Sequence, residues 1–171
     1  MLESFKTINA FVFDIDGVLT DGSLLIMDGG LMIRKMHVKD GYALQLAIKK
    51  GYLIFIISGG NSPQVKERLL KLGLSNVFMN IENKLKKLQE LSAQFNLKKE
   101  DILCMGDDIP DLEVMKYCGL ACCPADAVAE IKNISKYISP VKGGDGCVRD
   151  VIEKVMKLQS RWMADTHIPS V

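Results

Sequence analysis

The sequence predicts a three-layer α/β protein in which helices cover both faces of a parallel sheet. Three continuous apolar runs, at residues 10–13, 53–57 and 102–105, have the length and character of strands that are buried on both faces. Helical patterns separate these runs, and an alternation of strands and helices is typical of a parallel sheet. Each run also ends in a polar cluster, and ligands of such sheets bind beyond the carboxyl ends of the strands.

The segment between the first two strands carries an additional element. Residues 22–36 contain two short apolar pieces around Asp28, Gly29 and Gly30, a pattern that predicts a β-hairpin inserted after the first strand. The remaining helices are indicated by apolar positions three and four residues apart, and the second of them begins with a Ser-Pro pair that favours a helix start. The predicted helices span residues 41–50, 62–73, 83–95 and 147–158.

Length and composition favour one globular domain over residues 1–171. The chain is 48% hydrophobic and 25% charged, with a formal net charge of +1, so neither a nucleic acid nor a membrane is expected as a partner. The N-terminus lacks a basic stretch followed by an apolar core, and the apolar runs are too short to span a bilayer. The five cysteines include no Cys-x-x-Cys pair, which indicates reduced thiols and a cytoplasmic protein.

Two acids end the first apolar run. Asp14 and Asp16 lie one residue apart and are followed by Gly17. Neighbouring carboxylates repel one another, so they must be hydrated, protonated or neutralised by a cation. Mg²⁺ meets this need, because it takes one or two carboxylate ligands and leaves positions for a substrate phosphate. Taken alone, the motif fits a polar strand-to-loop transition equally well.

Further polar groups follow the second and third runs. The second run leads into Ser58, which is followed by two glycines, and the third leads into Gly106 and a group of acids. Because the carboxyl ends of neighbouring parallel strands meet at one edge, we expect these groups to share a site with Asp14 and Asp16. Such a density of negative charge requires a cation. The acids after the third run are Asp107, Asp108 and Asp111.

Lys84 supplies a positive side chain near these acids. In the helix predicted for residues 83–95, positions 84, 88, 91 and 95 share one face, and the last three are apolar. Lys84 therefore extends from the N-terminal end of the buried stripe, whereas Lys86 points away from it. The pattern leaves two interpretations: an ammonium that reaches solvent from the end of an apolar face, or one directed at a phosphate and the acids.

These elements, in this order, resemble the haloacid dehalogenase-like (HAD) phosphatase superfamily, whose pattern is a strand-terminal Asp-x-Asp, a strand-terminal Ser or Thr, a helix Lys and a Gly-Asp-Asp cluster. The resemblance implies a Rossmann-like core and Mg²⁺-dependent hydrolysis of phosphate esters. It makes Asp14 the nucleophile that forms an aspartyl-phosphate, and Asp16 the acid and then the base. Ser58, the Gly59 amide and Lys84 would hold the phosphate oxygens.

The same resemblance implies a metal site. Mg²⁺ would be bound by Asp14, by the backbone carbonyl of Asp16 and by Asp107. Asp108 and Asp111 would orient Lys84 and the waters of the metal ion. Many members of the superfamily also carry a cap domain over this site.

The spacing of the motifs leaves no room for a cap domain. The segment from Asp16 to Ser58 must hold the hairpin, a helix and a strand, and the segment from Lys84 to Gly106 holds one helix and one strand. A monomer without a cap leaves Asp14 open to water and unable to select a small substrate. We therefore expect either a macromolecular substrate or neighbouring subunits to cover the site.

Over its whole length the chain resembles the 3-deoxy-manno-octulosonate 8-phosphate (KDO 8-phosphate) phosphatases, which are homotetramers without a cap. The resemblance implies that the hairpins pack together and that a neighbouring subunit helps to close the site. It also implies an eight-carbon keto-sugar phosphate as substrate, with nine-carbon ulosonate 9-phosphates as the alternative. The segments that carry the resemblance are residues 16–22, 38–42, 106–108 and 143–149.

Within this family, residues beyond the catalytic motifs contact the substrate. Gly60 departs from the family pattern, since many members have Arg there and sialic-acid-type relatives have an acid, and this departure leaves the substrate open. His37 replaces the more usual Asn, and both donate hydrogen bonds. Without the resemblance, Arg68 fits a surface ion pair equally well. The substrate contacts that the resemblance implies are Asp16, His37, Val38, Lys39, Asp40, Gly41, Gly59, Gly60, Arg68 and Lys84.

Three other functions fit the sequence less well. A two-component receiver domain has a lone phospho-acceptor Asp after a later strand, and the second run here ends in Ser58 instead. A glycosyltransferase with an Asp-x-Asp motif needs a longer chain and a nucleotide-binding signal. A non-catalytic interaction domain would more easily have lost Asp14, Asp16 or Lys84. The tail at 159–171 has no assigned role, and its Trp162 would either anchor on another subunit or hang free.

Overall fold

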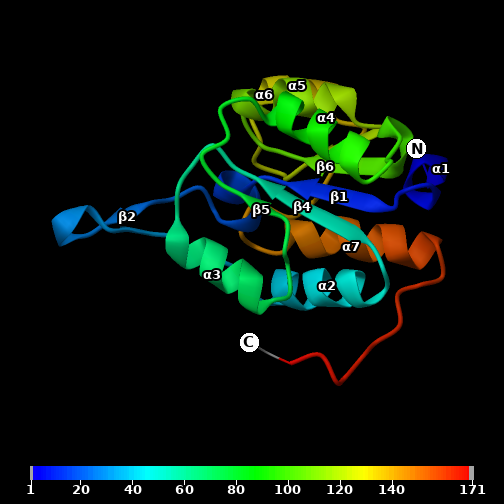
Figure 1. The fold of residues 1–171 in the computed structure, drawn as a ribbon, viewed down its shortest axis with the longest axis horizontal. Helices are drawn as coiled ribbons and strands as arrows, with labels where there is room; N and C mark the ends of the chain where they lie inside the picture. The colour runs from blue at the N-terminus through cyan, green and yellow to red at the C-terminus, as the bar shows by residue number, and fades with distance from the viewer. Residues whose placement is uncertain (1, 170–171) are drawn as a thin grey trace.

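The computed structural model describes residues 2–169 and contains a six-stranded parallel sheet with helices on both faces (Figure 1). The predicted fold class is therefore confirmed. The strand order is β5-β4-β1-β6-β7-β8, and every neighbouring pair runs parallel. The strands are β1 (Ala10–Phe13), β4 (Leu53–Ile57), β5 (Val77–Phe78), β6 (Ile102–Met105), β7 (Leu120–Cys123) and β8 (Tyr137–Ile138).

The helices divide between the two faces of the sheet. In Figure 1, α4, α5 and α6 lie above the sheet, and α2, α3 and α7 lie below it. Four of these helices match the predicted ones within a few residues, and α1, α5 and α6 were not predicted. The helices are α1 (Leu2–Lys6), α2 (Val38–Lys49), α3 (Pro63–Lys71), α4 (Lys84–Gln94), α5 (Leu112–Tyr117), α6 (Ala129–Ile134) and α7 (Cys147–Leu158). None of the helices within residues 2–169 is long and apolar enough to cross a membrane.

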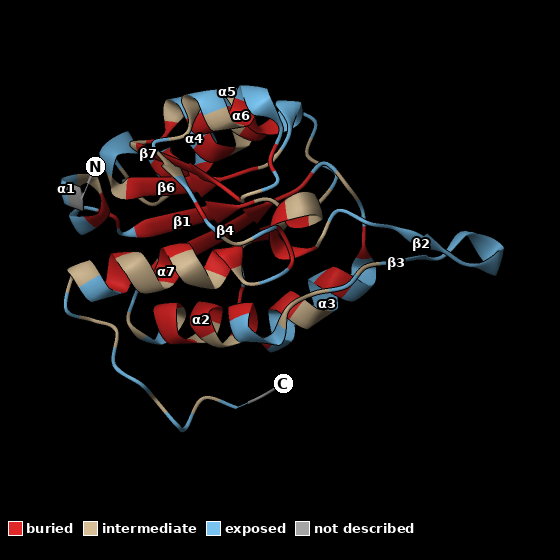
Figure 2. Cartoon of the chain, turned by 180° about the vertical axis from the view of Figure 1, so that it is seen from behind, coloured by how far each residue is buried: buried red, intermediate tan, exposed pale blue. Residues whose placement is uncertain are grey.

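The central strand shows why continuous apolar runs form this sheet. Side chains of a strand alternate between its two faces. Phe11 and Phe13 pack into the core on the side of α2 and α7, whereas Ala10 and Val12 pack into the second core beneath α4 and α5. All four residues are buried (Figure 2). A strand covered on both sides therefore cannot show the polar alternation of a surface strand.

The predicted hairpin is present and projects away from the rest of the molecule (Figures 1 and 2). Its strands β2 (Leu25–Ile26) and β3 (Met32–Ile33) pair antiparallel. Gly29 and Gly30 form the turn with φ values of +80° and +79°, a conformation that favours glycine. The apolar side chains of this arm are exposed, with Leu25 60% and Ile26 72% accessible.

The tail after α7 lies against the chain's own helix α2. Trp162 packs edge-on against Tyr42, with ring centroids 6.3 Å apart, and the Arg149 guanidinium lies 5.4 Å from the Trp162 ring. Lys49 of α2 forms a 2.6 Å ion pair with Asp165. The predicted tail spans 159–171, and its last two residues lie outside the described residues. The described part of the tail therefore anchors on its own subunit.

Candidate active site

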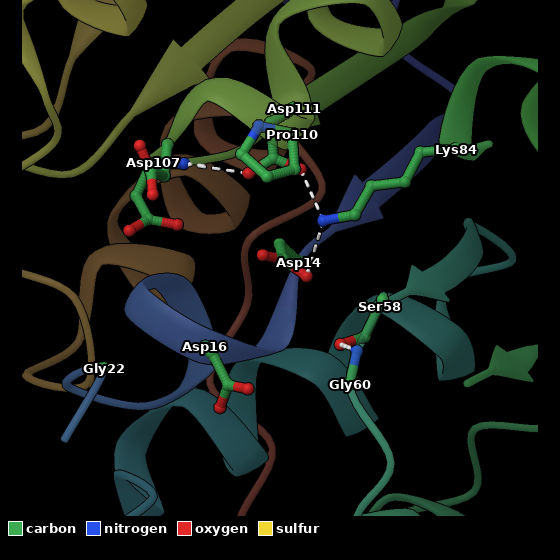
Figure 3. A pocket seen from close by; sticks show the side chains of 11 residues that line it. Asp14, Asp16, Gly22, Ser58, Gly60, Lys84, Asp107, Pro110 and Asp111 are labelled. Atoms are coloured by element: carbon green, nitrogen blue, oxygen red, sulfur yellow. Dashed lines mark hydrogen bonds and ion pairs between the residues drawn. The ribbon is translucent and has the colours of Figure 1, made fainter. Parts of the chain in front are cut away.

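A cavity of about 310 Å³ opens at the carboxyl ends of β1, β4 and β6 (Figure 3). The register of the sheet places it there, because Phe13 lies beside Ile56 on one side and Met105 on the other. The chain leaves all three strands at one edge, as the sequence predicts. The cavity is lined by Asp14, Asp16, Gly22, Ser58, Gly59, Gly60, Lys84, Asp107, Asp108, Pro110 and Asp111.

Lys84 lies between two carboxylates of this cavity. Its Nζ is 2.9 Å from Asp14 Oδ1 and donates a 2.7 Å hydrogen bond to Asp111 Oδ1. Lys84 is the first residue of α4, whose start is fixed by the Asn83 side chain accepting a hydrogen bond from the Lys86 amide. Burial lowers the pKa of Lys84, but Asp14 and Asp111 outweigh it and hold that pKa above its ordinary value. Lys84 is thus a buried ammonium directed at the acids.

Three carboxylates form a group suited to a hard cation. Asp14, Asp107 and Asp111 each place one oxygen within 4.8 Å of the other two. Burial, followed by the charge of Asp111, raises the pKa of Asp14 to about 6, and the same causes together with Asp14 raise that of Asp107 to about 7. Asp14 Oδ1 is buried, and Lys84 is the cation beside it. A divalent cation relieves this crowding, so the residues present fit Mg²⁺.

The composition of this group differs from the set that the sequence suggests. Asp111 was expected to support Lys84, and it does contact Lys84, but it also belongs to the carboxylate group itself. Its Oδ2 accepts a 3.2 Å hydrogen bond from the Asp107 amide. Gly106 makes this possible, since a Cβ there would collide with the Asp111 side chain. The Asp16 side chain is not part of the group.

Asp16 instead pairs with Arg34, which follows β3 at the base of the hairpin. Arg34 Nε donates to Asp16 Oδ1 at 2.6 Å, and Nη2 donates to Oδ2 at 3.1 Å. The two residues are 18 positions apart and lie in different elements, so no spacing rule relates them. Arg34 was not predicted as a site residue. The one signal for it in the sequence is an arginine near the end of the predicted hairpin segment, residues 22–36.

The other strand-end residues line the same cavity in different ways. Ser58 is buried, and its Oγ accepts a 3.2 Å hydrogen bond from the Gly60 amide. Gly59 and Gly60 present backbone at the rim. Asp108 is exposed, and its carboxylate accepts a 2.7 Å hydrogen bond from the Ile109 amide rather than from Lys84.

All but one of the remaining substrate contacts suggested by the sequence lie in a second cavity of about 300 Å³. His37, Val38, Asp40 and Gly41 line it at the start of α2, together with Arg68 of α3 and several apolar side chains. No lining residue belongs to both cavities. Lys39 is exposed and does not line this second cavity.

Asp40 is the buried acid of the second cavity. Its Oδ1 accepts a 2.7 Å hydrogen bond from the Arg149 amide, while its Oδ2 and the neighbouring His37 Nδ1 are buried without a partner. Burial raises the pKa of Asp40 to about 7, although the Arg149 amide opposes the shift. Both cavities therefore contain acids that are costly to ionise in the isolated chain.

The family model of the haloacid dehalogenase-like hydrolases matches residues 77–151, a segment that contains β6 and the acids that follow it. A crystal structure of 3-deoxy-D-manno-octulosonate 8-phosphate phosphatase from Moraxella catarrhalis, in complex with magnesium ion, phosphate ion and KDO, superposes with a TM-score of 0.90. The two sequences are 30% identical, over 93% of this chain and 91% of the Moraxella chain. The chain belongs to the family of 3-deoxy-D-manno-octulosonate 8-phosphate phosphatases.

Two further relatives support this assignment. The phosphatase of the same name from Escherichia coli strain K12 is 29% identical over 156 residues, which are 91% of this chain and 83% of the relative. The crystal structure of the Yersinia pestis phosphatase has a TM-score of 0.91 and 28% identity, and the match covers 94% of this chain and 86% of the Yersinia chain. Family membership removes the receiver domain and the glycosyltransferase from consideration.

Proposed function

We propose that the chain is a Mg²⁺-dependent phosphatase that hydrolyses KDO 8-phosphate to KDO and inorganic phosphate. The observation that carries the proposal is the group of Asp14, Asp107, Asp111 and Lys84 in one strand-end cavity. The Moraxella relative, which binds magnesium, phosphate and KDO, supports the metal and the substrate. The chain aligns with that relative over more than nine tenths of either sequence.

Asp14 is the proposed nucleophile. One of its carboxylate oxygens attacks phosphorus, the bond from phosphorus to the sugar oxygen breaks, and Asp16 delivers a proton to the departing oxygen. Asp16 then takes a proton from water, which attacks the aspartyl-phosphate, releases phosphate and regenerates Asp14. Lys84 neutralises the charge on the transferring phosphoryl group, because its ammonium already lies 2.9 Å from Asp14.

The remaining strand-end groups hold the phosphoryl group and the metal. Ser58 and the Gly59 amide are proposed donors to the phosphate oxygens, and Asp111 keeps Lys84 in place. Asp14 and Asp107 would bind Mg²⁺ together with the backbone carbonyl of Asp16. The bound ion supplies Lewis-acid polarisation of the phosphate and offsets the charge of the carboxylates.

A phosphate-release assay over a panel of substrates tests this proposal. KDO 8-phosphate should give the highest kcat/KM, a nine-carbon ulosonate 9-phosphate a lower one, and hexose phosphates the lowest. EDTA should stop turnover and added Mg²⁺ should restore it. If the nine-carbon substrate has a higher kcat/KM than KDO 8-phosphate, it takes the place of KDO 8-phosphate as the proposed substrate. A hexose or nucleotide phosphate with a higher kcat/KM than both would refute the assignment to sugar acids.

The second cavity is the proposed contact surface for the sugar acid. It offers the Arg68 guanidinium and the start of α2, which are groups suited to a carboxylate and hydroxyls. Lys39 does not line the cavity, but it is exposed next to Val38 and is proposed to contact the substrate from outside. The second cavity shares no lining residue with the first cavity, at the carboxyl ends of β1, β4 and β6, which we call the phosphate cavity. We therefore propose that a neighbouring subunit brings the two surfaces to one substrate.

A homotetramer is the proposed assembly, and the hairpin supports it. Its exposed apolar residues form a patch of the kind that marks an interface. Light scattering of wild-type protein should give four times the chain mass, and Ile26→Glu should lower that mass by placing a charge in the interface. A fully active wild-type monomer of 19.0 kDa would contradict the tetramer. Five buried, unpaired cysteines support a cytoplasmic location.

A further inference from the structure

Arg34 brings a guanidinium from the hairpin to Asp16 at the edge of the active site, although Arg34 does not itself line the cavity. It follows β3 directly, its side chain is 6% exposed, and both of its contacts are to Asp16, a residue that lines the phosphate cavity. Among residues 2–169, it is the one arginine that forms an ion pair with a residue of that cavity. Nothing in the mechanism above uses it.

The charges of the cavity call for such a group. Five carboxylates and one ammonium line it, and the ammonium of Lys84 is already shared between Asp14 and Asp111. A sugar acid phosphate brings two further anions, a phosphate and a carboxylate. Mg²⁺ and Lys84 are matched to the phosphate, and Arg68 lies in the other cavity, so a carboxylate that enters this cavity still needs a cation from this side.

The geometry leaves Arg34 free to serve that carboxylate. A guanidinium has five N–H donors, and Asp16 accepts two of them. Gly60, which lines the cavity, lies beside the fork, because a Cβ at that position would lie 3.3 Å from Asp16 Oδ2 and 3.6 Å from Arg34 Nη2. Asp16 thus holds the fork in place while three donors remain, which is the arrangement that bidentate recognition of a carboxylate requires.

We propose that Arg34 binds the carboxylate of the sugar acid jointly with the Arg68 guanidinium of the second cavity, and thereby contributes to the enzyme's preference for acidic sugar phosphates. This inference rests on the proposed function and adds to it a second cation for the same carboxylate. In this proposal the Arg34 guanidinium contacts the carboxylate next to Gly60, a position that has no side chain to make the contact itself. The hairpin then contributes to specificity as well as to assembly.

The test compares substrates with and without a carboxylate. KM and kcat are measured for KDO 8-phosphate, a nine-carbon ulosonate 9-phosphate and p-nitrophenyl phosphate, in wild type, Arg34→Gln and Arg34→Ala. Glutamine keeps an amide N–H for Asp16 but carries no charge. Lys35→Ala is the matched control, since Lys35 is the exposed neighbour of Arg34 and pairs with Asp21. Circular dichroism checks that each variant is folded.

Both Arg34 variants should raise KM for the sugar acid phosphates about 10- to 100-fold, at least ten times more than for p-nitrophenyl phosphate. Lys35→Ala should leave the ratio between substrates as in wild type. If glutamine restores wild-type KM, or if the loss falls on kcat equally for all substrates, Arg34 only positions Asp16 and the inference is overturned.

Failure of the proposed function gives a different result. A wild type that prefers the nine-carbon substrate contradicts the proposed eight-carbon substrate, while the inference is still judged on the carboxylate effect of the Arg34 variants. A wild type that cleaves p-nitrophenyl phosphate but neither sugar acid phosphate contradicts both.

Discussion

The two cavities bring polar groups together by different means. In the phosphate cavity, three parallel strands end at one edge, so the register of the sheet alone gathers Asp14, Ser58 and Asp107. In the second cavity, the start of α2 meets the side of α3, and Arg68 reaches it across an apolar wall that includes Leu44 and Leu72. The first arrangement follows from backbone pairing, whereas the second depends on how two helices pack.

The cavities also differ in how their acids are compensated. Asp14 and Asp107 share a region with a lysine and with space for a cation. Asp40 has a single backbone donor, from Arg149, and no side-chain cation within ion-pair distance among the described residues. We therefore expect Mg²⁺ to change the stability that depends on the acids of the first cavity. The stability that depends on Asp40 in the second cavity should change with pH but not with Mg²⁺.

The largest expected effect is the loss of catalysis in the first cavity. Asp14→Asn keeps the shape of the side chain but removes the charge of the proposed nucleophile, which is also a proposed metal ligand. It should lower kcat by at least about 10²- to 10⁴-fold, as measured by phosphate release. Asp28→Asn, which changes an exposed acid of the hairpin turn, is the control and should stay near wild type. Wild-type turnover in purified Asp14→Asn would sink the assignment of the nucleophile.

The second cavity should affect substrate binding rather than the chemical step. Arg68→Ala removes a cationic fork, and we expect KM for KDO 8-phosphate to rise about tenfold, with a much smaller change for p-nitrophenyl phosphate. Lys71→Ala is the control, because Lys71 lies on the same helix and pairs with Glu67 at the surface. Equal changes for both substrates would mean that Arg68 supports the fold of α3 instead.

The smallest expected effect separates the acids of the two cavities by pH. The raised pKa values, about 6 for Asp14 and about 7 for Asp107 and Asp40, mean that these groups favour the folded state when protonated. Their stabilising contribution is complete below about pH 4 and is lost as pH rises through 6 to 7. The melting temperature of the metal-free protein should therefore fall from pH 5 to pH 8.

Mg²⁺ and the substitution Asp40→Asn should each reverse a different part of the fall in melting temperature between pH 5 and pH 8. Mg²⁺ should raise the melting temperature more at pH 8 than at pH 5, because it binds the ionised forms of Asp14 and Asp107. Part of the fall in melting temperature between pH 5 and pH 8 should remain when Mg²⁺ is present, and Asp40→Asn should make this remaining fall smaller. The change should be about 2–4 °C for each kcal/mol by which ionisation of Asp40 destabilises the fold. Calorimetry with and without Mg²⁺ measures both effects. An equal Mg²⁺ effect at both pH values, or an unaltered pH profile in Asp40→Asn, would contradict this separation.

The same contrast explains how much of the structure was predictable from the sequence. The strands Ala10–Phe13, Leu53–Ile57 and Ile102–Met105 were predicted with their observed bounds, because each is a continuous apolar run that ends in polar residues. The strands Val77–Phe78 and Tyr137–Ile138 were missed, since two residues are too few to show a period. The strand Leu120–Cys123 was also missed, because its small side chains lack a β-branched or aromatic signal.

The candidate site divides in the same way. Its strand-end acids and Lys84 follow from motif spacing, and the structure places them in one cavity. The contact between Arg34 and Asp16 depends on the path of the hairpin, and the inclusion of Asp111 in the carboxylate group depends on the turn at Gly106. Neither contact follows from a regular spacing of residues in the sequence, so both became visible only in the structure.

The packing of Trp162 against Tyr42 and Arg149 has a consequence for the fluorescence of the protein. Trp162 is the chain's one tryptophan, so the intrinsic fluorescence excited at the red edge of the protein's absorption arises from the tail alone. Asp165, beside it, is tied to Lys49 of the helix whose first turn lines the second cavity. Release of the tail would move the emission to longer wavelength as the indole becomes hydrated, so an unlabelled sample reports directly whether a ligand dislodges it.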